Sequence, residues 1–294
     1  MTDAIDPPDT WRDRALLLAC RVSARPFLSL PLPWSVHRRA FLLTAPTLPR
    51  RPGLTVTATT IAGVPGRITA PEAPRGTILW LHGGGFVLGS SRGVYANLAA
   101  ALARATNMRV VMPDYRLAPE HPFPAGPDDC LAVARALSAE GPLVLGGDSA
   151  GGCFALTTLA GLLACGTPPA RVLLASPAVD LDPARPVPPA PGEVVLPVSM
   201  LRRVCRDYVG QADARDPRVS PIHADFTGAP PVLIQCARGE ILEGDSDAIA
   251  ERLRAAGAQV TVQKETGVPH VWQVFAGRTP KADRAIAAMA KSLT

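Results

Sequence analysis

The 294-residue sequence has few of the features that mark nucleic-acid-binding proteins. Only three of its 30 basic residues are lysines, and aromatic residues make up 5% of the chain. Arginines occur singly or in pairs and never in a run of five. Because a nucleic-acid-binding surface combines a basic stripe with aromatic side chains, we expect no nucleic-acid partner.

The six cysteines lack the spacing of a metal or disulfide motif. No two of them stand as Cys-x-x-Cys, and histidines and cysteines form no cluster at metal-ligand spacing. A chain of this length can bury a large core without disulfides. We therefore expect reduced, buried cysteines and no metal.

Export signals and membrane-spanning stretches are also missing. Leu16–Cys20 is apolar but short, and acidic residues (Asp3, Asp6 and Asp9) precede it, whereas a signal peptide begins with basic residues. Residues 149–170 carry no charge, but glycine and proline pairs interrupt them, which favours a buried core helix. The sequence predicts a cytoplasmic protein without stable membrane insertion.

What the chain does contain is a regular alternation of short β-rich runs with helical stretches. The strand candidates are Leu54–Thr60, Gly76–Leu81, Arg109–Met112, Leu143–Gly147, Arg171–Ser176, Pro231–Ala237 and Gln259–Glu265. The helix candidates are Val94–Thr106, Pro127–Glu140, Ala150–Cys165, Asp245–Ala256 and Lys281–Leu293. Several strand candidates are continuous apolar runs, as in strands buried on both faces. The alternation predicts an α/β fold, with a mostly parallel central sheet and helices on both faces.

Two segments do not fit the alternation. Residues 1–45 are helical in character and broken by prolines. Residues 183–210 begin with the proline-rich stretch Pro183–Pro197 and continue into a short amphipathic helix, Ser199–Val209. Proline-rich sequence between a strand and a helix can form a linker or a cap over a site, and both interpretations are open at this point.

The strongest functional motif is Gly147-Asp148-Ser149-Ala150-Gly151, which has the pattern Gly-x-Ser-x-Gly. It follows an apolar strand candidate and opens a helix of small residues. A serine on such a sharp turn has its hydroxyl exposed above the sheet, and the flanking glycines remove side chains that would clash. The helix N-terminus adds free N–H groups that favour an oxyanion. This context predicts Ser149 as a nucleophile.

The second motif is a histidine followed by three glycines, His82–Gly85, directly after the strand candidate that ends at Leu81. In α/β-hydrolases such a loop supplies oxyanion-hole donors, joined by the N–H of the residue after the nucleophile. We therefore predict Gly83, Gly84 and Ala150 as the donors. The alternative, a phosphate-binding loop, is disfavoured because neither glycine-rich phosphate motif is present. The imidazole of the motif is expected to orient the loop.

The order of residues along the chain selects the general base. In this fold the nucleophile comes first, then the acid, then the histidine. Of the five histidines, only His223 and His270 follow Ser149, and only His270 also follows a plausible acid-bearing loop. His270 is therefore the predicted base.

Three carboxylates after the strand candidate Pro231–Ala237 could supply the acid: Glu240, Glu243 and Asp245. The orienting carboxylate must lie on the loop that leaves the strand. Glu240 is nearest to the strand end, and Asp245 precedes a helical run as an N-cap residue would. Glu240 is favoured, with Glu243 and Asp245 as alternatives.

Together with Tyr115–Glu120 and the pair Ser220-Pro221, these motifs resemble the hormone-sensitive-lipase-like esterases of the α/β-hydrolase superfamily. The resemblance covers roughly residues 50–294. It implies a carboxylic ester hydrolase with a preference for short acyl chains and no cofactor. Most members carry aspartate as the triad acid, whereas this chain has Glu240, as a subset of such esterases does.

The resemblance also implies how the chain is organised. Residues 1–45 would form the N-terminal part of a small helical cap, and residues 46–294 the α/β-hydrolase catalytic domain, with a cap insertion at about 183–210. Asp114 and Tyr115–Glu120 would have a structural role beneath the oxyanion glycines.

The expected reaction is acyl transfer through a covalent serine ester, with His270 as base and Glu240 orienting the imidazole. An amidase or acyltransferase with the same triad is an alternative, and so is a non-catalytic binding protein on the same fold. The expected partner is a small-molecule ester. The oligomeric state is left open, and a homodimer is compatible with the sequence.

Overall fold

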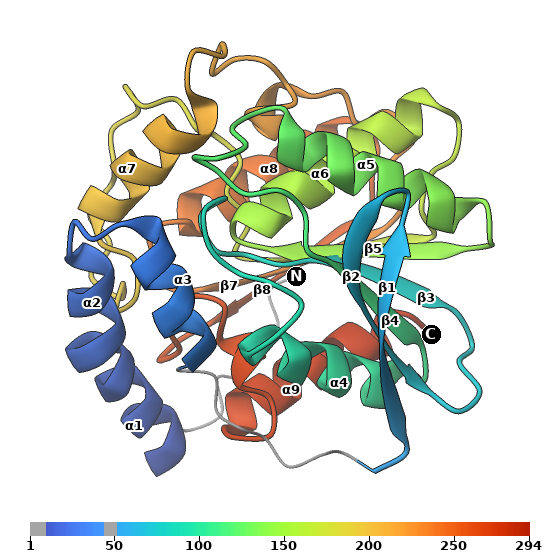
Figure 1. Ribbon diagram of the computed structural model, residues 1–294, viewed down its shortest axis with the longest axis horizontal. Coiled ribbons are helices and arrows are strands. Elements are labelled where there is room, and N and C mark those ends of the chain that lie inside the picture. Colours follow the sequence, from blue (N-terminus) through green and yellow to red (C-terminus); the bar gives the residue numbers. More distant parts are fainter. Residues whose placement is uncertain (1–9, 44–51) are drawn as a thin grey trace.

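The computed structural model describes residues 10–43 and 52–294, and an eight-stranded sheet runs through the molecule (Figure 1). The strands are β1 (Leu54–Ile61), β2 (Val64–Pro71), β3 (Thr77–Leu81), β4 (Arg109–Pro113), β5 (Leu143–Asp148), β6 (Arg171–Ala175), β7 (Val232–Ala237) and β8 (Val260–Glu265). Their order is β1-β2-β4-β3-β5-β6-β7-β8. β2 pairs antiparallel with β1 and β4, and all other neighbours are parallel. The prediction of a mostly parallel sheet is confirmed.

Strand β2 is the one strand of this sheet that the sequence did not predict. It contains Pro65, Gly66 and Pro71, residue types that argue against a strand interior. Its pairing with β4 runs only from Gly66 to Thr69. Neither proline therefore has to donate an N–H to that neighbour, and the strand tolerates both.

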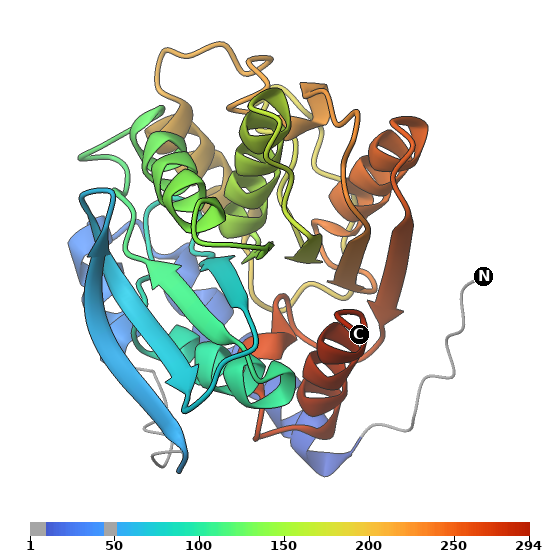
Figure 2. The ribbon, with the colours of Figure 1, turned by 90° about the vertical axis from the view of Figure 1, so that its right-hand side faces the viewer.

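Helices cover both faces of the sheet, as predicted (Figure 2). The main ones are α4 (Val94–Thr106), α5 (Ala125–Ser138), α6 (Ala150–Ala164), α7 (Val198–Val209), α8 (Glu243–Ala255) and α9 (Pro280–Lys291). α5, α6 and α8 lie on one face, and α4 and α9 on the other. Short 3-10 turns, η2 (Pro221–His223) and η3 (Trp272–Phe275), complete this part. Each predicted strand and helix begins and ends within two residues of an observed one.

Helix α6 is buried along most of its length and lies at the centre of its layer. The uncharged stretch that contains it is therefore a core helix, as expected. No helix of the described residues is long and apolar enough to cross a membrane. All six cysteines are free thiols; four are buried, but Cys165 is exposed and Cys205 is half-buried, so the expectation of burial is wrong for these two.

The N-terminal segment is helical, as predicted. α1 (Trp11–Ala19) continues through a π-helical turn, η1 (Cys20–Ala24), into α2 (Arg25–Ser29), and α3 (Trp34–Leu43) follows after a proline-containing bend. A capping box between Thr10 and Asp13 begins α1. Residues 1–9 of the predicted N-terminal cap segment, and its predicted boundary at residue 45, lie outside the described residues.

This N-terminal segment contacts helix α7, which lies beside it in Figure 1. The indole N–H of Trp34 donates to Asp207 Oδ2 at 2.7 Å, and the guanidinium of Arg203 lies 3.8 Å from the centre of the Trp34 ring. Arg203 also donates to the carbonyl of Leu32 at 2.8 Å. Trp34 is buried and belongs to the same apolar cluster as Val204 and Tyr208 of α7, so its ring helps to connect the two segments.

Replacing Trp34 should therefore loosen the N-terminal helices. We expect Trp34→Ala to lower the free energy of unfolding by about 3–5 kcal/mol, the usual cost of removing a buried aromatic side chain. Trp34→Phe, which keeps an aromatic ring and loses the hydrogen bond to Asp207, should cost about 1–2 kcal/mol. Urea denaturation measures both, and equal effects of the two variants would contradict this role of the ring.

Candidate active site

Ser149 lies on the tight turn between β5 and α6. Its backbone has φ 52° and ψ −120°, a left-handed conformation that is strained for a residue with a side chain. A Cβ on Gly147 would lie 2.2 Å from the carbonyl oxygen of Gly151, and a Cβ on Gly151 would lie 2.0 Å from that of Leu81. The motif glycines are thus required by close packing of the backbone, and the turn holds Ser149 in its unusual geometry.

His270 and Glu240 form a close pair on neighbouring loops. Glu240 follows β7 and His270 follows β8, and Nδ1 of His270 lies 2.5 Å from Oε2 of Glu240. A carboxylate can only accept here, so Nδ1 carries the shared hydrogen. Nε2 of His270 is buried and has no hydrogen-bond partner in the described part of the chain. That nitrogen is available to accept a proton.

Glu240 is held in place on its other side. Its Oε1 accepts hydrogen bonds from Ser176 Oγ at 2.6 Å and from the amide of Ala237 at 2.9 Å. The next amide, of Ile241, donates to Glu193 Oε2 at 3.2 Å. Glu193 belongs to the proline-rich stretch, so this stretch supports the loop that carries Glu240. Neither Ser176 nor Glu193 stood out in the sequence, because neither belongs to a recognisable motif.

Charge sets the protonation of the imidazole. Burial disfavours the protonated form of His270, but the negative charge and hydrogen bond of Glu240 outweigh this effect, so the pKa of His270 is raised above its ordinary value of 6.5. The pair thus stabilises an imidazolium, the form that a general base reaches after taking a proton.

The two alternative acids make other contacts. Glu243 accepts from the amide of Gly239 at 2.7 Å and pairs with Lys264 at 2.9 Å. Asp245 accepts from the amide of Val179 at 2.9 Å and forms an ion pair with Arg185. The N-cap interpretation of Asp245 is wrong, because α8 already begins two residues earlier and the Asp245 carboxylate is buried against other elements.

The loop His82–Gly85, called the glycine loop below, presents its amides differently from the prediction. The N–H of Gly83 donates to Asp148 Oδ2 at 3.0 Å and is therefore not available to a ligand, which corrects the role predicted for Gly83. The amides of Gly84 and Gly85 donate no hydrogen bond within the described residues. Ala150 is the first residue of α6, where an N–H has no acceptor in the helix. The free amides are those of Gly84, Gly85 and Ala150.

Asp148 connects the glycine loop to the serine turn, which is the turn between β5 and α6 that carries Ser149. Besides the Gly83 amide, its carboxylate accepts from Trp80 Nε1 at 2.9 Å and from Tyr95 Oη at 2.7 Å. The side chain is fully buried, and burial raises the pKa of Asp148 to about 6 although its three donors act in the opposite direction. Asp148 belongs to the serine motif, but the sequence alone indicates no role for it.

His82 and Tyr115 support the loop from below. Nδ1 of His82 donates to the carbonyl of Gly83 at 2.8 Å, and the His82 ring stacks on Tyr115 with centres 4.2 Å apart. Tyr115 Oη donates to the carbonyl of His82 at 2.5 Å. Burial lowers the pKa of His82 to about 4, so the ring is neutral. Both side chains thus orient the loop as expected, whereas Asp114 binds Ser91 instead.

A cavity of about 90 Å³ opens beside Ser149. Its walls come from the glycine loop, the serine turn, the proline-rich stretch and α7, with Phe86, Leu181 and Val204 among the apolar lining residues. Arg185, which lines it too, is paired with Asp245. Within residues 10–43 and 52–294, no group of three histidine, cysteine or acidic side chains could hold a metal ion.

The site combines a serine on a strand-to-helix turn with a histidine–carboxylate pair and free amides. At one end of a mostly parallel sheet, this combination defines an α/β hydrolase. The family model of the alpha/beta hydrolase fold matches residues 78–274. The chain belongs to the hormone-sensitive lipase family of esterases within this fold.

Relatives support this assignment. An acetyl-hydrolase of Streptomyces hygroscopicus is 37% identical over 71% of this chain and 72% of its own length. An esterase of Acinetobacter venetianus is 32% identical over 84% of both chains. The crystal structure of an esterase from the bacterial hormone-sensitive lipase family is 31% identical, covers 98% of both chains and superposes with a TM-score of 0.89.

The contacts of Asp148 predict a role for this residue in turnover. In Asp148→Asn one side of the group becomes an N–H donor, so it cannot accept from Trp80, Tyr95 and Gly83 together. We expect the glycine loop to shift and kcat for a small aryl ester to fall about 10- to 100-fold, with KM little changed, because misplaced oxyanion donors weaken transition-state binding.

Asp129 offers a matched control, since it is a buried carboxylate paired with Arg116 outside the site. Asp129→Asn should change stability and leave kcat close to the wild-type value. Equal kcat values for Asp148→Asn and the wild type would contradict the proposed link between this carboxylate and the loop.

Proposed function

We propose that this chain hydrolyses carboxylic esters of short acyl chains, with Ser149 as nucleophile, His270 as base and Glu240 as the orienting acid. The observation that carries the proposal is the 2.5 Å contact between His270 and Glu240. Ser149, Glu240 and His270 follow β5, β7 and β8, which run parallel. The carboxyl ends of parallel strands lie at one edge of a sheet, where ligands bind in open α/β folds.

The first half-reaction forms an acyl-enzyme. Nε2 of His270 takes the proton of Ser149 Oγ as this oxygen attacks the ester carbonyl, and Glu240 stabilises the resulting imidazolium. The imidazolium then protonates the leaving alcohol. In the second half-reaction His270 takes a proton from water, which attacks the acyl-enzyme and releases the acid.

The negative oxygen of the tetrahedral intermediate would be held by the amides of Gly84, Gly85 and Ala150. Their free N–H groups support this assignment, and the amide of Gly83, turned to Asp148, would fix the position of the loop. Donors that are already oriented stabilise the developing charge without reorganisation.

The proposed preference for short acyl chains rests on the segments that enclose the cavity. We propose that residues 183–210, together with the N-terminal helices, form a cap above Ser149. The small volume of the cavity, its proline-containing wall and the bond of Glu193 to the acid loop support a stiff enclosure. An acyl chain gains burial only while it fits inside, at about 0.8 kcal/mol per methylene.

The first test is removal of the nucleophile. Ser149→Ala should fold normally and lose at least about 1,000-fold in kcat on a small aryl ester, because only the oxyanion amides and substrate binding remain. Thermal denaturation checks the fold. Retention of more than about a hundredth of the wild-type kcat would show that another residue is the nucleophile.

The second test uses the pH profile. Only the neutral imidazole accepts a proton, and Glu240 raises the pKa of His270, so kcat/KM should rise with pH with a midpoint above 6.5. Glu240→Gln should lower this midpoint and reduce kcat by about 100-fold or more. Glu243→Gln, the matched control, should leave the midpoint in place. A larger shift of the midpoint in Glu243→Gln than in Glu240→Gln would assign the acid role to Glu243.

The third test measures acyl length and bond type. With p-nitrophenyl esters, kcat/KM should peak between about C2 and C6 and fall for longer chains as the cavity fills. The corresponding p-nitroanilides should be hydrolysed much more slowly. A steady rise to C12 with activation by emulsified substrate would indicate a lipase, and comparable rates for amides would indicate an amidase.

A further inference from the structure

The exposed apolar side chains of this molecule are concentrated in the N-terminal helices. Seven large hydrophobic residues are exposed in the described part of the chain, and six of them lie between residues 11 and 42. Trp11 is 74% exposed, Leu18 59% and Val22 63%. Exposed apolar residues scattered singly are ordinary, but a group of them on one element marks an interaction surface.

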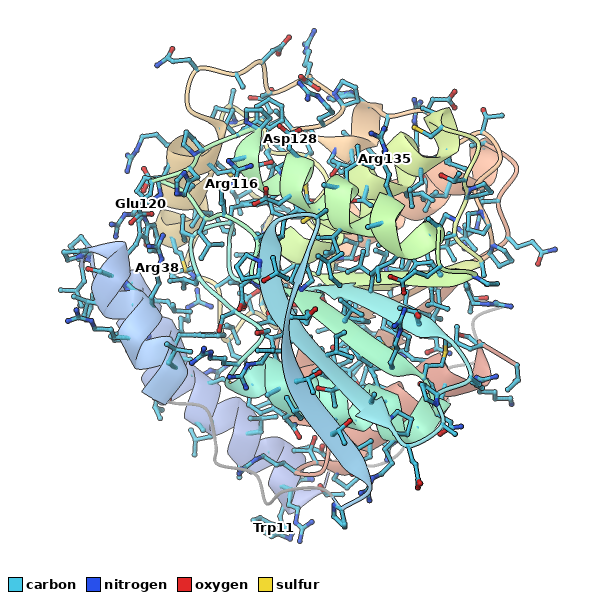
Figure 3. All side chains as sticks on the ribbon, turned by 45° about the vertical axis from the view of Figure 1, so that its right-hand side comes forward. Trp11, Arg38, Arg116, Glu120, Asp128 and Arg135 are labelled. Atoms are coloured by element: carbon cyan, nitrogen blue, oxygen red, sulfur yellow. The ribbon has the colours of Figure 1, made fainter. Side chains whose placement is uncertain are left out.

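Three of these side chains form a stripe along one face of α1 and its continuation η1. Trp11, Leu18 and Val22 are spaced by seven and four residues, which are about two turns and one turn of a helix. We call this face the apolar stripe. Figure 3 shows Trp11 at the outer end of the N-terminal helix, pointing away from the rest of the molecule.

Arginines flank the apolar stripe. Arg14 and Arg21 are spaced by seven residues on one side, and Arg12 lies on the other. All three are exposed, and none forms an ion pair within the described residues. Residues 11–42 contain six arginines and one acidic residue. The net charge of this short segment is therefore as large as that of the whole chain, which is +5.

A second cavity adjoins the same helix. It has a volume of about 310 Å³ and lies between α1 and the loops that precede His270 and Glu240. Arg14, Arg21 and Arg238 line it together with Leu17 and Val268. The side chain of Arg238 is exposed and also makes no ion pair with a described residue. Three guanidinium groups around a partly apolar hollow fit an anionic headgroup attached to hydrocarbon.

We propose that the N-terminal helices dock on the surface of an anionic phospholipid bilayer, with the apolar stripe in the headgroup region and the phosphate of a lipid between Arg14, Arg21 and Arg238. An apolar helix face with tryptophan at one end and arginines beside it is the pattern of helices that lie in a membrane interface. Charge selects this partner over a second copy, because a symmetric contact would bring two rows of unpaired arginines together. The docking is reversible and peripheral.

The test is binding of the full chain to vesicles at about 0.1 M salt. Vesicles of phosphatidylcholine with 30% phosphatidylglycerol should bind the protein, and pure phosphatidylcholine vesicles should bind it at least about tenfold more weakly, with binding falling as salt rises. The triple variant Arg14→Gln/Arg21→Gln/Arg238→Gln should bind about 100-fold more weakly, because each arginine near an anionic surface contributes about fivefold.

The matched control is Arg135→Gln/Arg215→Gln/Arg254→Gln, which removes the same charge from exposed positions outside the N-terminal helices and the cavity. It should keep most of the binding. Hydrolysis of a water-soluble ester checks that every variant is folded. If both triple variants lose binding equally, the effect reflects net charge alone and the proposed surface is wrong.

Tryptophan emission gives an independent signal from the apolar stripe. Of the four tryptophans, Trp34, Trp80 and Trp272 are buried, so a blue shift on addition of anionic vesicles would come from Trp11. The shift should vanish in Trp11→Phe, which keeps binding, and Leu18→Ser/Val22→Ser should weaken binding about tenfold or more.

Three results would overturn the proposal. The first is an absence of binding to anionic vesicles, or equal binding to neutral ones. The second is a concentration-dependent dimer that Leu18→Ser/Val22→Ser abolishes, which would assign the apolar stripe to a second copy. The third is binding that appears only after removal of residues 1–9. That result would indicate that the arginines bind the acidic residues of that segment instead of lipid.

Discussion

The site depends on one buried carboxylate, that of Asp148. It accepts hydrogen bonds from the indole of Trp80 at the end of β3, from the hydroxyl of Tyr95 in α4 and from the amide of Gly83. These three donors come from β3, the glycine loop and α4, so one side chain ties the turn that carries Ser149 to three neighbouring elements. Burying a carboxylate costs free energy of folding unless hydrogen-bond donors satisfy it. We therefore expect its three donors to keep a single arrangement around Asp148.

A second constraint comes from the insertion between β6 and β7. Its Glu193 accepts from the amides of Val195 and Leu196, at 2.6 and 2.7 Å, and also from the amide of Ile241, next to Glu240. The proline-rich stretch, which lines the cavity, and the loop that carries Glu240 are thus joined by a hydrogen bond. We therefore expect a change in the proline-rich stretch to shift the loop that carries Glu240 as well.

Most of the fold could be predicted from apolar runs and helix periodicity, because the buried strands are nearly continuous in valine, isoleucine and leucine. Strand β2 could not, since its prolines only become acceptable once the pairing with β4 is known. The Gly-x-Ser-x-Gly motif singled out Ser149, and chain order singled out His270. The sequence could not say which amide of the glycine loop faces inward, because that depends on Asp148 accepting from Gly83. It favoured Glu240 over Glu243 and Asp245, and among these three carboxylates Glu240 is the one with a described hydrogen bond to His270.

The most direct test of the account is covalent labelling with diethyl p-nitrophenyl phosphate, followed by mass spectrometry of the whole chain and its peptides. The account predicts stoichiometric loss of ester hydrolysis and the addition of a single diethylphosphoryl group, located on Ser149, with no labelling of Ser149→Ala. Full inactivation with the label on another residue, or retention of activity with Ser149 fully labelled, would contradict it.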